Sequence, residues 1–120
     1  MKMKIIVAAV ALLGLGAASP IASAVADPAA AKCSLNAGPE TDCIVDFGVV
    51  GSAGSVEFVI PAGKVAFKGD LQGNDKLKVA VLQLNQSAYP VDTGECAVAP
   101  GHVLCSAKAG TVSAVVEAKR

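Results

Sequence analysis

The sequence predicts an all-β protein, a small antiparallel β-sandwich or partly open barrel of about six to eight short strands held by two disulfides. Short runs rich in Val and Ile recur at roughly ten-residue spacing, with Gly, Pro, Asn and Asp between them. Two of these runs alternate polar with apolar residues, as half-buried strands do. The chain also holds four cysteines and only four aromatic residues, so its core must consist mainly of aliphatic side chains.

Residues 1–26 have the three parts of a secretory signal peptide. Two lysines precede an apolar run over residues 5–18, and small residues follow that run. The run of about 14 residues is shorter than the roughly 20 that span a bilayer. We therefore expect cleavage before Asp27, or alternatively before Val25, and a secreted or cell-envelope protein without an integral membrane segment. An uncut membrane anchor is the competing interpretation.

Residues 27–120 are predicted to form one secreted domain, in which residues 27–32 are an Ala-rich, flexible tail. A polar turn is expected over residues 69–75 and a polar loop over residues 86–94. A helix over residues 76–86 is the alternative to a strand there, but the valines and the alternation favour the strand. The expected strands are 43–50, 55–60, 64–68, 76–85, 96–99, 102–105 and 111–118.

The four cysteines predict two disulfides, because an even count after a signal peptide is typical of exported domains. If Pro100–Gly101 closes a two-residue turn, Cys96 faces Cys105 at a non-hydrogen-bonded pair, where Cα atoms approach to roughly 4.5 Å. Cys33 then pairs with Cys43. Long-range pairing of Cys33 with Cys105, or of Cys43 with Cys96, is the alternative. The spacings are too wide for a typical Cys₄ zinc site.

Charge and composition argue against several classes of partner. All ten acidic residues but only eight of the ten basic ones follow residue 26, so the mature chain is slightly acidic. It has no basic patch with interleaved aromatic residues, which argues against nucleic-acid binding. We find no cofactor motif and expect no metal. The missing Trp disfavours carbohydrate binding through aromatic platforms.

Two groups of polar residues have a structural explanation beside a functional one. His102, the only histidine, could serve as a general base or a metal ligand. No nucleophile motif accompanies it, and its place just after a Pro-Gly turn explains it equally well. Asp70, Asn74 and Asp75 could ligate calcium, but such residues are also common in turns, and the EF-hand spacing is absent.

The loop over residues 86–94, with the cysteine hairpin that follows, is the best candidate for a binding surface. Loops on rigid scaffolds commonly carry binding residues, and a disulfide would stiffen this one. An ordinary connection between strands is the alternative. The candidate residues are Ser87, Tyr89, Pro90, Asp92, Glu95, Pro100 and His102.

The function predicted from these observations is that of a small, secreted, non-enzymatic protein. It would act as a binding or surface module for an unknown macromolecule, such as an extracellular protein. A protease inhibitor that uses the region 86–105 is the alternative, because secreted inhibitors present a stiffened loop. A further alternative is a carrier for a small apolar ligand, which would need an internal cavity.

Overall fold

The computed structural model describes residues 29–73 and 75–120, and this part of the chain is all-β. The predicted signal peptide, residues 1–26, lies outside the described residues. No helix in the described ranges is long and apolar enough to cross a membrane. The strands are β1 (Ala29–Leu35), β2 (Thr41–Val50), β3 (Ala53–Ile60), β4 (Gly63–Gln72), β5 (Lys76–Leu84), β6 (Ser87–Pro90), β7 (Thr93–Ala99), β8 (His102–Ala109) and β9 (Val112–Lys119).

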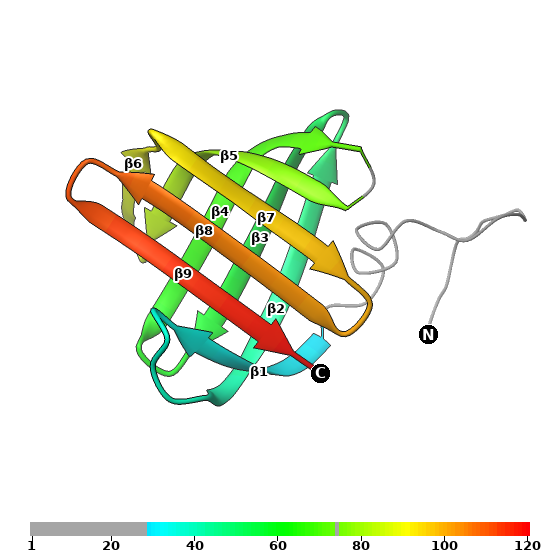
Figure 1. Ribbon diagram of the computed structural model, residues 1–120, viewed down its shortest axis with the longest axis vertical. Coiled ribbons are helices and arrows are strands. Elements are labelled where there is room, and N and C mark those ends of the chain that lie inside the picture. The colour runs from blue at the N-terminus through cyan, green and yellow to red at the C-terminus, as the bar shows by residue number, and fades with distance from the viewer. Residues whose placement is uncertain (1–28, 74) are drawn as a thin grey trace, which may run out of the picture.

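The strands form a single antiparallel sheet that closes into an eight-strand barrel. Neighbours in the barrel are consecutive in the chain except for β5 and β7, and β9 returns to pair with β1. The strand β5 pairs with β6 near its end and with β7 near its start. The strands β6 and β7 together therefore take the place of one strand in the barrel wall. Figure 1 shows β7, β8 and β9 crossing in front of β2, β3 and β4. The all-β prediction is confirmed, and of the two expected architectures the barrel replaces the sandwich.

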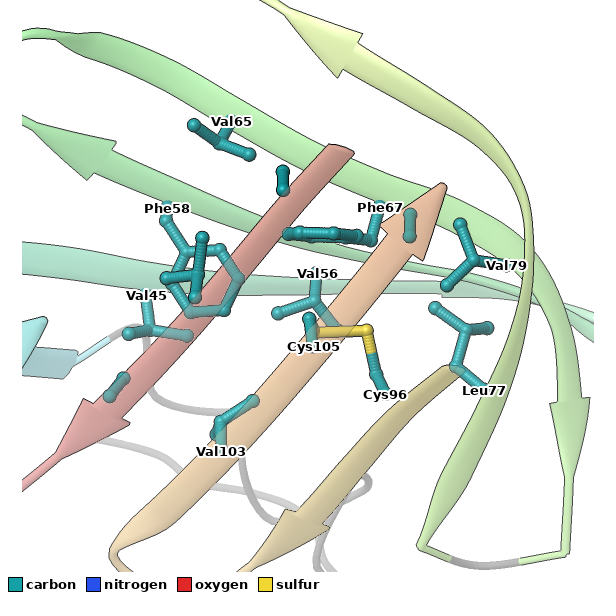
Figure 2. Packing of buried hydrophobic residues seen from close by; sticks show 14 of the residues in the cluster. Val45, Val56, Phe58, Val65, Phe67, Leu77, Val79, Cys96, Val103 and Cys105 are labelled. Carbon is teal, nitrogen blue, oxygen red and sulfur yellow. A yellow bond between two sulfur atoms is a disulfide. The ribbon is translucent and has the colours of Figure 1, made fainter. Parts of the chain in front are cut away.

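Large side chains line one wall of the interior and small ones the opposite wall. Phe47, Phe58 and Phe67 come from β2, β3 and β4 and are buried. The rings of Phe58 and Phe67 meet edge to face, with centroids 5.8 Å apart (Figure 2). The inward positions of β8 and β9 include the buried alanines Ala107, Ala109, Ala114 and Ala118. Because the small side chains leave room for the rings, side chains fill the interior of the narrow barrel.

A β-bulge in β5 explains why the apolar pattern of this strand changes phase. Leu77 and Val79 face the core, but the next fully buried residue is Leu82. The register with β4 shifts between Lys68 and Gly69, which leaves Ala80 as the extra residue. A Cβ atom on Gly69 would lie 1.9 Å from the carbonyl oxygen of Lys78, so the bulge requires glycine at this position.

Two segments expected to be irregular are strands. Residues 29–32, predicted as part of a flexible tail, belong to β1, which pairs with both β2 and β9 and closes the barrel. Residues 87–90, predicted as loop, form β6 along the end of β5. Both predictions were wrong for the same reason: pairing with distant strands outweighs the weak β-propensity of Ala, Ser and Pro. The strand β4 also continues to Gln72, beyond the predicted 64–68.

The predicted disulfides are both present. Cys33 is bonded to Cys43 across β1 and β2, and Cys96 is bonded to Cys105 across β7 and β8. Cys96 lies directly opposite Cys105, with a Cα–Cα distance of 4.0 Å. Gly101 has a φ of 75°, as the predicted turn requires. All four cysteines are buried, so both bridges are part of the core.

Candidate functional site

The residues predicted as one binding surface lie at two ends of the barrel. Ser87, Tyr89 and Pro90 belong to β6, and Asp92 follows them at the same end. Pro100 and His102 lie beyond the far end of β7, a strand of seven residues that spans roughly 20 Å. Glu95 is exposed on the wall between them. The structure therefore does not bring the seven residues together.

His102 is engaged in a polar contact on the barrel wall. Its Nε2 lies 2.7 Å from Oε2 of Glu117 on β9, and both side chains are partly exposed. The hydrogen bond with His102 lowers the pKa of Glu117 below its ordinary value. We find no group of three or more potential metal ligands within the described ranges. The contact joins two neighbouring strands, which is the structural explanation of this histidine.

The acidic residues proposed as calcium ligands are separated by the fold. Asp70 lies within β4, opposite Lys78 of β5, and not in a loop. The carbonyl of Asp75 accepts a hydrogen bond from the N–H of Val98 at 2.8 Å. Asn74 lies outside the described residues. Asp70 and Asp75 thus have ordinary places in a strand and a turn.

One end of the barrel holds the β1–β2, β3–β4, β5–β6 and β8–β9 turns. At this end, three Asn or Asp residues join the ends of neighbouring strands at three places, which we call junctions. Asn36 donates its N–H to the carbonyl of Val115 at 2.7 Å, and its Oδ1 accepts the N–H of Val115 at 2.8 Å. Asn85 makes the same reciprocal pair with Lys64. Asp92 donates its N–H to Lys108 and accepts the N–H of Gly110. These side chains extend the ladders β9–β1, β4–β5 and β7–β8 by one step each.

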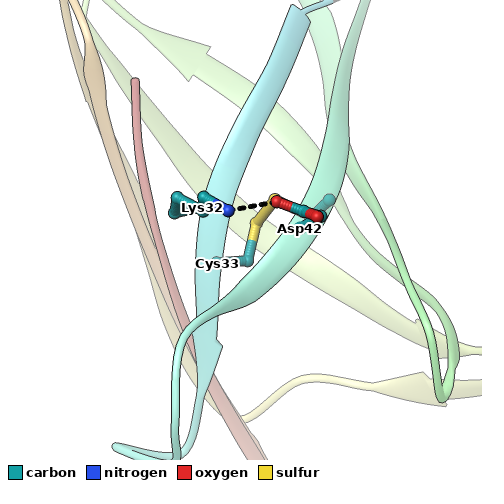
Figure 3. The surroundings of a disulfide bond; sticks show 4 residues. Lys32, Cys33 and Asp42 are labelled. Carbon is teal, nitrogen blue, oxygen red and sulfur yellow. Dashed lines mark hydrogen bonds and ion pairs between the residues drawn. A yellow bond between two sulfur atoms is a disulfide. The ribbon is translucent and has the colours of Figure 1, made fainter.

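In the part of the chain that the structure describes, the fourth such junction, between β2 and β3, has no clamp of this kind. The ladder stops at the pair Ile44 and Val59, although β2 begins three residues earlier, at Thr41. Continuing the register would place Asp42 opposite Pro61, which has no N–H to donate. The carboxylate of Asp42 is bonded to the ammonium group of Lys32 on β1 and not to β3 (Figure 3). The first residues of β2 are therefore paired on one side only.

An apolar groove of about 260 Å³ lies at this unclamped junction. Ile44 and Val59 line the groove on the outer face of the sheet, and their side chains are 45% and 43% exposed. Ile60 and Pro61 line the β3 side. The remaining lining residues come from β1 and β2 and are Ala30, Ala31, Asp42 and Cys43. We call this hollow the β2–β3 groove.

An exposed ion pair and a buried disulfide lie on the β1–β2 side of the β2–β3 groove. The hydrogen bond with Asp42 raises the pKa of the Lys32 ammonium group above its ordinary value. The Cys33–Cys43 bridge lies directly beside this ion pair, as Figure 3 shows. Because β3 does not hold the start of β2, this bridge and the β1 ladder are what keep it in place.

Sequence reasoning missed the β2–β3 groove, although a signal was present. Cys43-Ile44-Val45 and Phe58-Val59-Ile60 are runs of three apolar residues within strands. Because neighbouring side chains of a strand point to opposite faces, the middle residue of such a run must face outward. Two such outward positions that pair across neighbouring strands predict an exposed apolar patch.

Comparison of the chain with protein-family models, with curated proteins and with solved structures gave no match.

Proposed function

We propose that the protein is a secreted, non-enzymatic binding module that holds a partner polypeptide in the β2–β3 groove. The observation that carries the proposal is the exposure of Ile44 and Val59 side by side in a hollow. Outward apolar side chains grouped in a concavity favour an interaction site over plain solvent exposure. The signal-peptide pattern and the two disulfides support an oxidising, extracellular setting.

The rigidity of the groove also supports a binding role. Its β1–β2 side is held by a buried disulfide, and its floor is part of the closed sheet. A wall that keeps its shape loses little conformational entropy when a partner docks. The partner we propose is a macromolecule, an extracellular polypeptide.

A displayed peptide library tests this proposal. Peptides are selected on the wild-type domain, residues 27–120, and then measured against Ile44→Lys, which places a charge in the groove. The matched control is Leu104→Lys, at an outward position of β8 that is 40% exposed and remote from the groove lining. We expect selected peptides to lose about tenfold or more in affinity for Ile44→Lys, the equivalent of about 1.4 kcal/mol, and little for Leu104→Lys. Failure to select any peptide, or equal affinity for both variants, would refute the proposal.

A protease inhibitor acting through the region 86–105 remains the alternative function. The exposed Pro100–Gly101 turn, braced by the buried Cys96–Cys105 bridge, favours it. A panel of secreted proteases tests this alternative, because an inhibitor produces stoichiometric loss of activity. A carrier for a small apolar ligand has less support, since side chains from every wall pack in the interior.

A further inference from the structure

We infer that the β2–β3 groove receives its partner by strand addition: a short extended polypeptide segment pairs with the backbone of Asp42 and rests an apolar side chain on Ile44 and Val59. The inference rests on the proposed function and adds to it the mode of recognition and the conformation of the partner. The observations behind it are the direction of the Asp42 backbone groups, the missing N–H of Pro61 on the β3 side, and the exposed side chains of Ile44 and Val59.

The direction of the Asp42 backbone groups follows from how β1 pairs with its two neighbours. Asn36, the residue after β1, donates its N–H to β9. Because alternate residues of a strand bond to opposite sides, the even-numbered residues of β1 direct their backbone groups toward β9 and the odd-numbered ones toward β2. Ala31 faces Cys43 in the register, so these two residues bond to each other. Alternate residues of a strand bond to opposite sides, so Asp42 and Ile44 direct their N–H and C=O toward β3. Ile44 finds Val59 there.

Asp42 finds no backbone partner on the β3 side within residues 29–73 and 75–120. The strand β3 ends at Ile60, which pairs with Gly63 of β4. The next residue, Pro61, lacks the N–H that the Asp42 carbonyl would accept. One donor and one acceptor of Asp42 are thus directed into the groove, as at the edge of an unfinished sheet.

An extended polypeptide matches this arrangement better than another kind of ligand. Its own N–H and C=O can bond to those of Asp42 as a pair, which is how strand addition supplies affinity. It must enter from the barrel end, because the Ile44–Val59 pair closes the ladder beyond the groove. A side chain on its outer face then lies over Ile44 and Val59, which selects an apolar residue.

A second free edge of the sheet, along β6, is unsuited to this role. The strand β6 has only four residues, and among the described residues it pairs with β5 and with no other strand. Its last residue is Pro90, and proline on an edge strand blocks further pairing. By contrast, Asp42 is held by β1 and by the neighbouring Cys33–Cys43 bridge in the geometry that pairing needs.

The test uses a peptide selected as above and synthesised in a series in which one backbone N–H at a time is methylated. We expect methylation of the residue that faces Asp42 to weaken binding about tenfold, the worth of the one hydrogen bond that its N–H donates to the Asp42 carbonyl, and methylation of its two neighbours to have little effect. On the protein, Asp42→Pro removes the donor, whereas the control Asp42→Ala keeps it. We expect Asp42→Pro to weaken binding about tenfold and Asp42→Ala by less than about twofold.

The outcomes separate this inference from the proposed function. A peptide that depends on Ile44 but binds equally in every methylated form would overturn strand addition and leave the groove as a binding site. The absence of any peptide that depends on Ile44 would overturn the proposed function itself. An alternating effect of methylation, with loss on Asp42→Pro, supports the inference.

Discussion

The two disulfide-braced hairpins, β1–β2 and β7–β8, have similar covalent frames but different surroundings. Their bridges span ten and nine residues of sequence, and both lie in the core. The β7–β8 hairpin is bonded on its two sides, to β5 and to β9. The β1–β2 hairpin is bonded to β9, but the ladder with β3 does not reach the first residues of β2, which pair with β1 alone among the described strands.

The comparison shows that a stiffened hairpin is not by itself a binding surface. The sequence favoured the loop over residues 86–94 with the β7–β8 hairpin, because loops on rigid scaffolds commonly carry binding residues and a disulfide stiffens this hairpin. The structure places an apolar groove and open backbone groups on the other hairpin. What distinguishes the two hairpins is that the β2–β3 ladder ends before the start of β2, and where a ladder ends depends on the register of the whole sheet.

Proline substitution should distinguish the two hairpins most strongly. Val98 donates its N–H to Asp75, so the neighbouring Ala97 directs its N–H toward β8. Ala97→Pro therefore removes a ladder bond and should cost about 3 kcal/mol or more. Asp42→Pro removes an N–H without a strand partner and should cost less than about 1 kcal/mol. Urea unfolding measures both, and equal costs would contradict the open junction.

Removal of each disulfide should distinguish the two hairpins through peptide binding. The paired replacements Cys33→Ala with Cys43→Ala, and Cys96→Ala with Cys105→Ala, should each cost about 2–4 kcal/mol in the free energy of unfolding, because the closed loops are similar in length. Only the first replacement should also weaken binding of a selected peptide, since only that bridge holds the start of β2. If, at a temperature where both variants are folded, only the variant without the Cys96–Cys105 bridge lost peptide binding, the site would lie on the β7–β8 hairpin, which would contradict the proposal.

The Asn clamps provide a smaller contrast. Asn36→Gly keeps the freedom for the observed φ of 51° and removes the Oδ1 that accepts the Val115 N–H. It should cost about 1 kcal/mol. Asp42→Ala removes an exposed ion pair and should cost less than about 0.5 kcal/mol. The two unfolding free energies are compared in urea, and a larger cost for Asp42→Ala would mean that its side chain closes its junction as Asn36 does.

The smallest expected effects are on pH dependence, and they differ between the hairpins. The pKa of Glu117 is lowered by its bond with His102, so its stabilisation is present above the ordinary value of 4.5 and is lost as the pH falls through the folded-state pKa. The pKa of Lys32 is raised by Asp42, so its stabilisation is present below 10.5 and is lost as the pH rises through the folded-state pKa. Glu117→Gln should reduce the acid-side loss of stability, and Lys32→Met the alkaline-side loss. If the urea midpoints of both variants followed that of the wild type across both pH ranges, neither ion pair would contribute to the pH dependence of stability.

Local patterns in the sequence predicted the strands with clear alternation and the local disulfide pairs. They failed at β1 and β6, because Ala-rich and Pro-containing segments become strands here only through partners distant in sequence. The same limit applies to the candidate site. The exposure of Ile44 and Val59 can be inferred from their apolar neighbours, but the end of the β2–β3 ladder depends on how far each strand runs before Pro61. The bulge at Ala80 likewise required the close approach that Gly69 permits.

Hydrogen exchange at the backbone N–H of Asp42 in the free protein would show whether the junction between β2 and β3 is open. An N–H that faces an open junction exchanges with solvent without unfolding, whereas a ladder N–H requires at least local opening. We predict that Asp42 exchanges at least about a hundredfold faster than Ile44, whose N–H faces Val59. Equal protection of Asp42 and Ile44 would show that the junction is closed and would contradict both the open edge and the strand addition built on it.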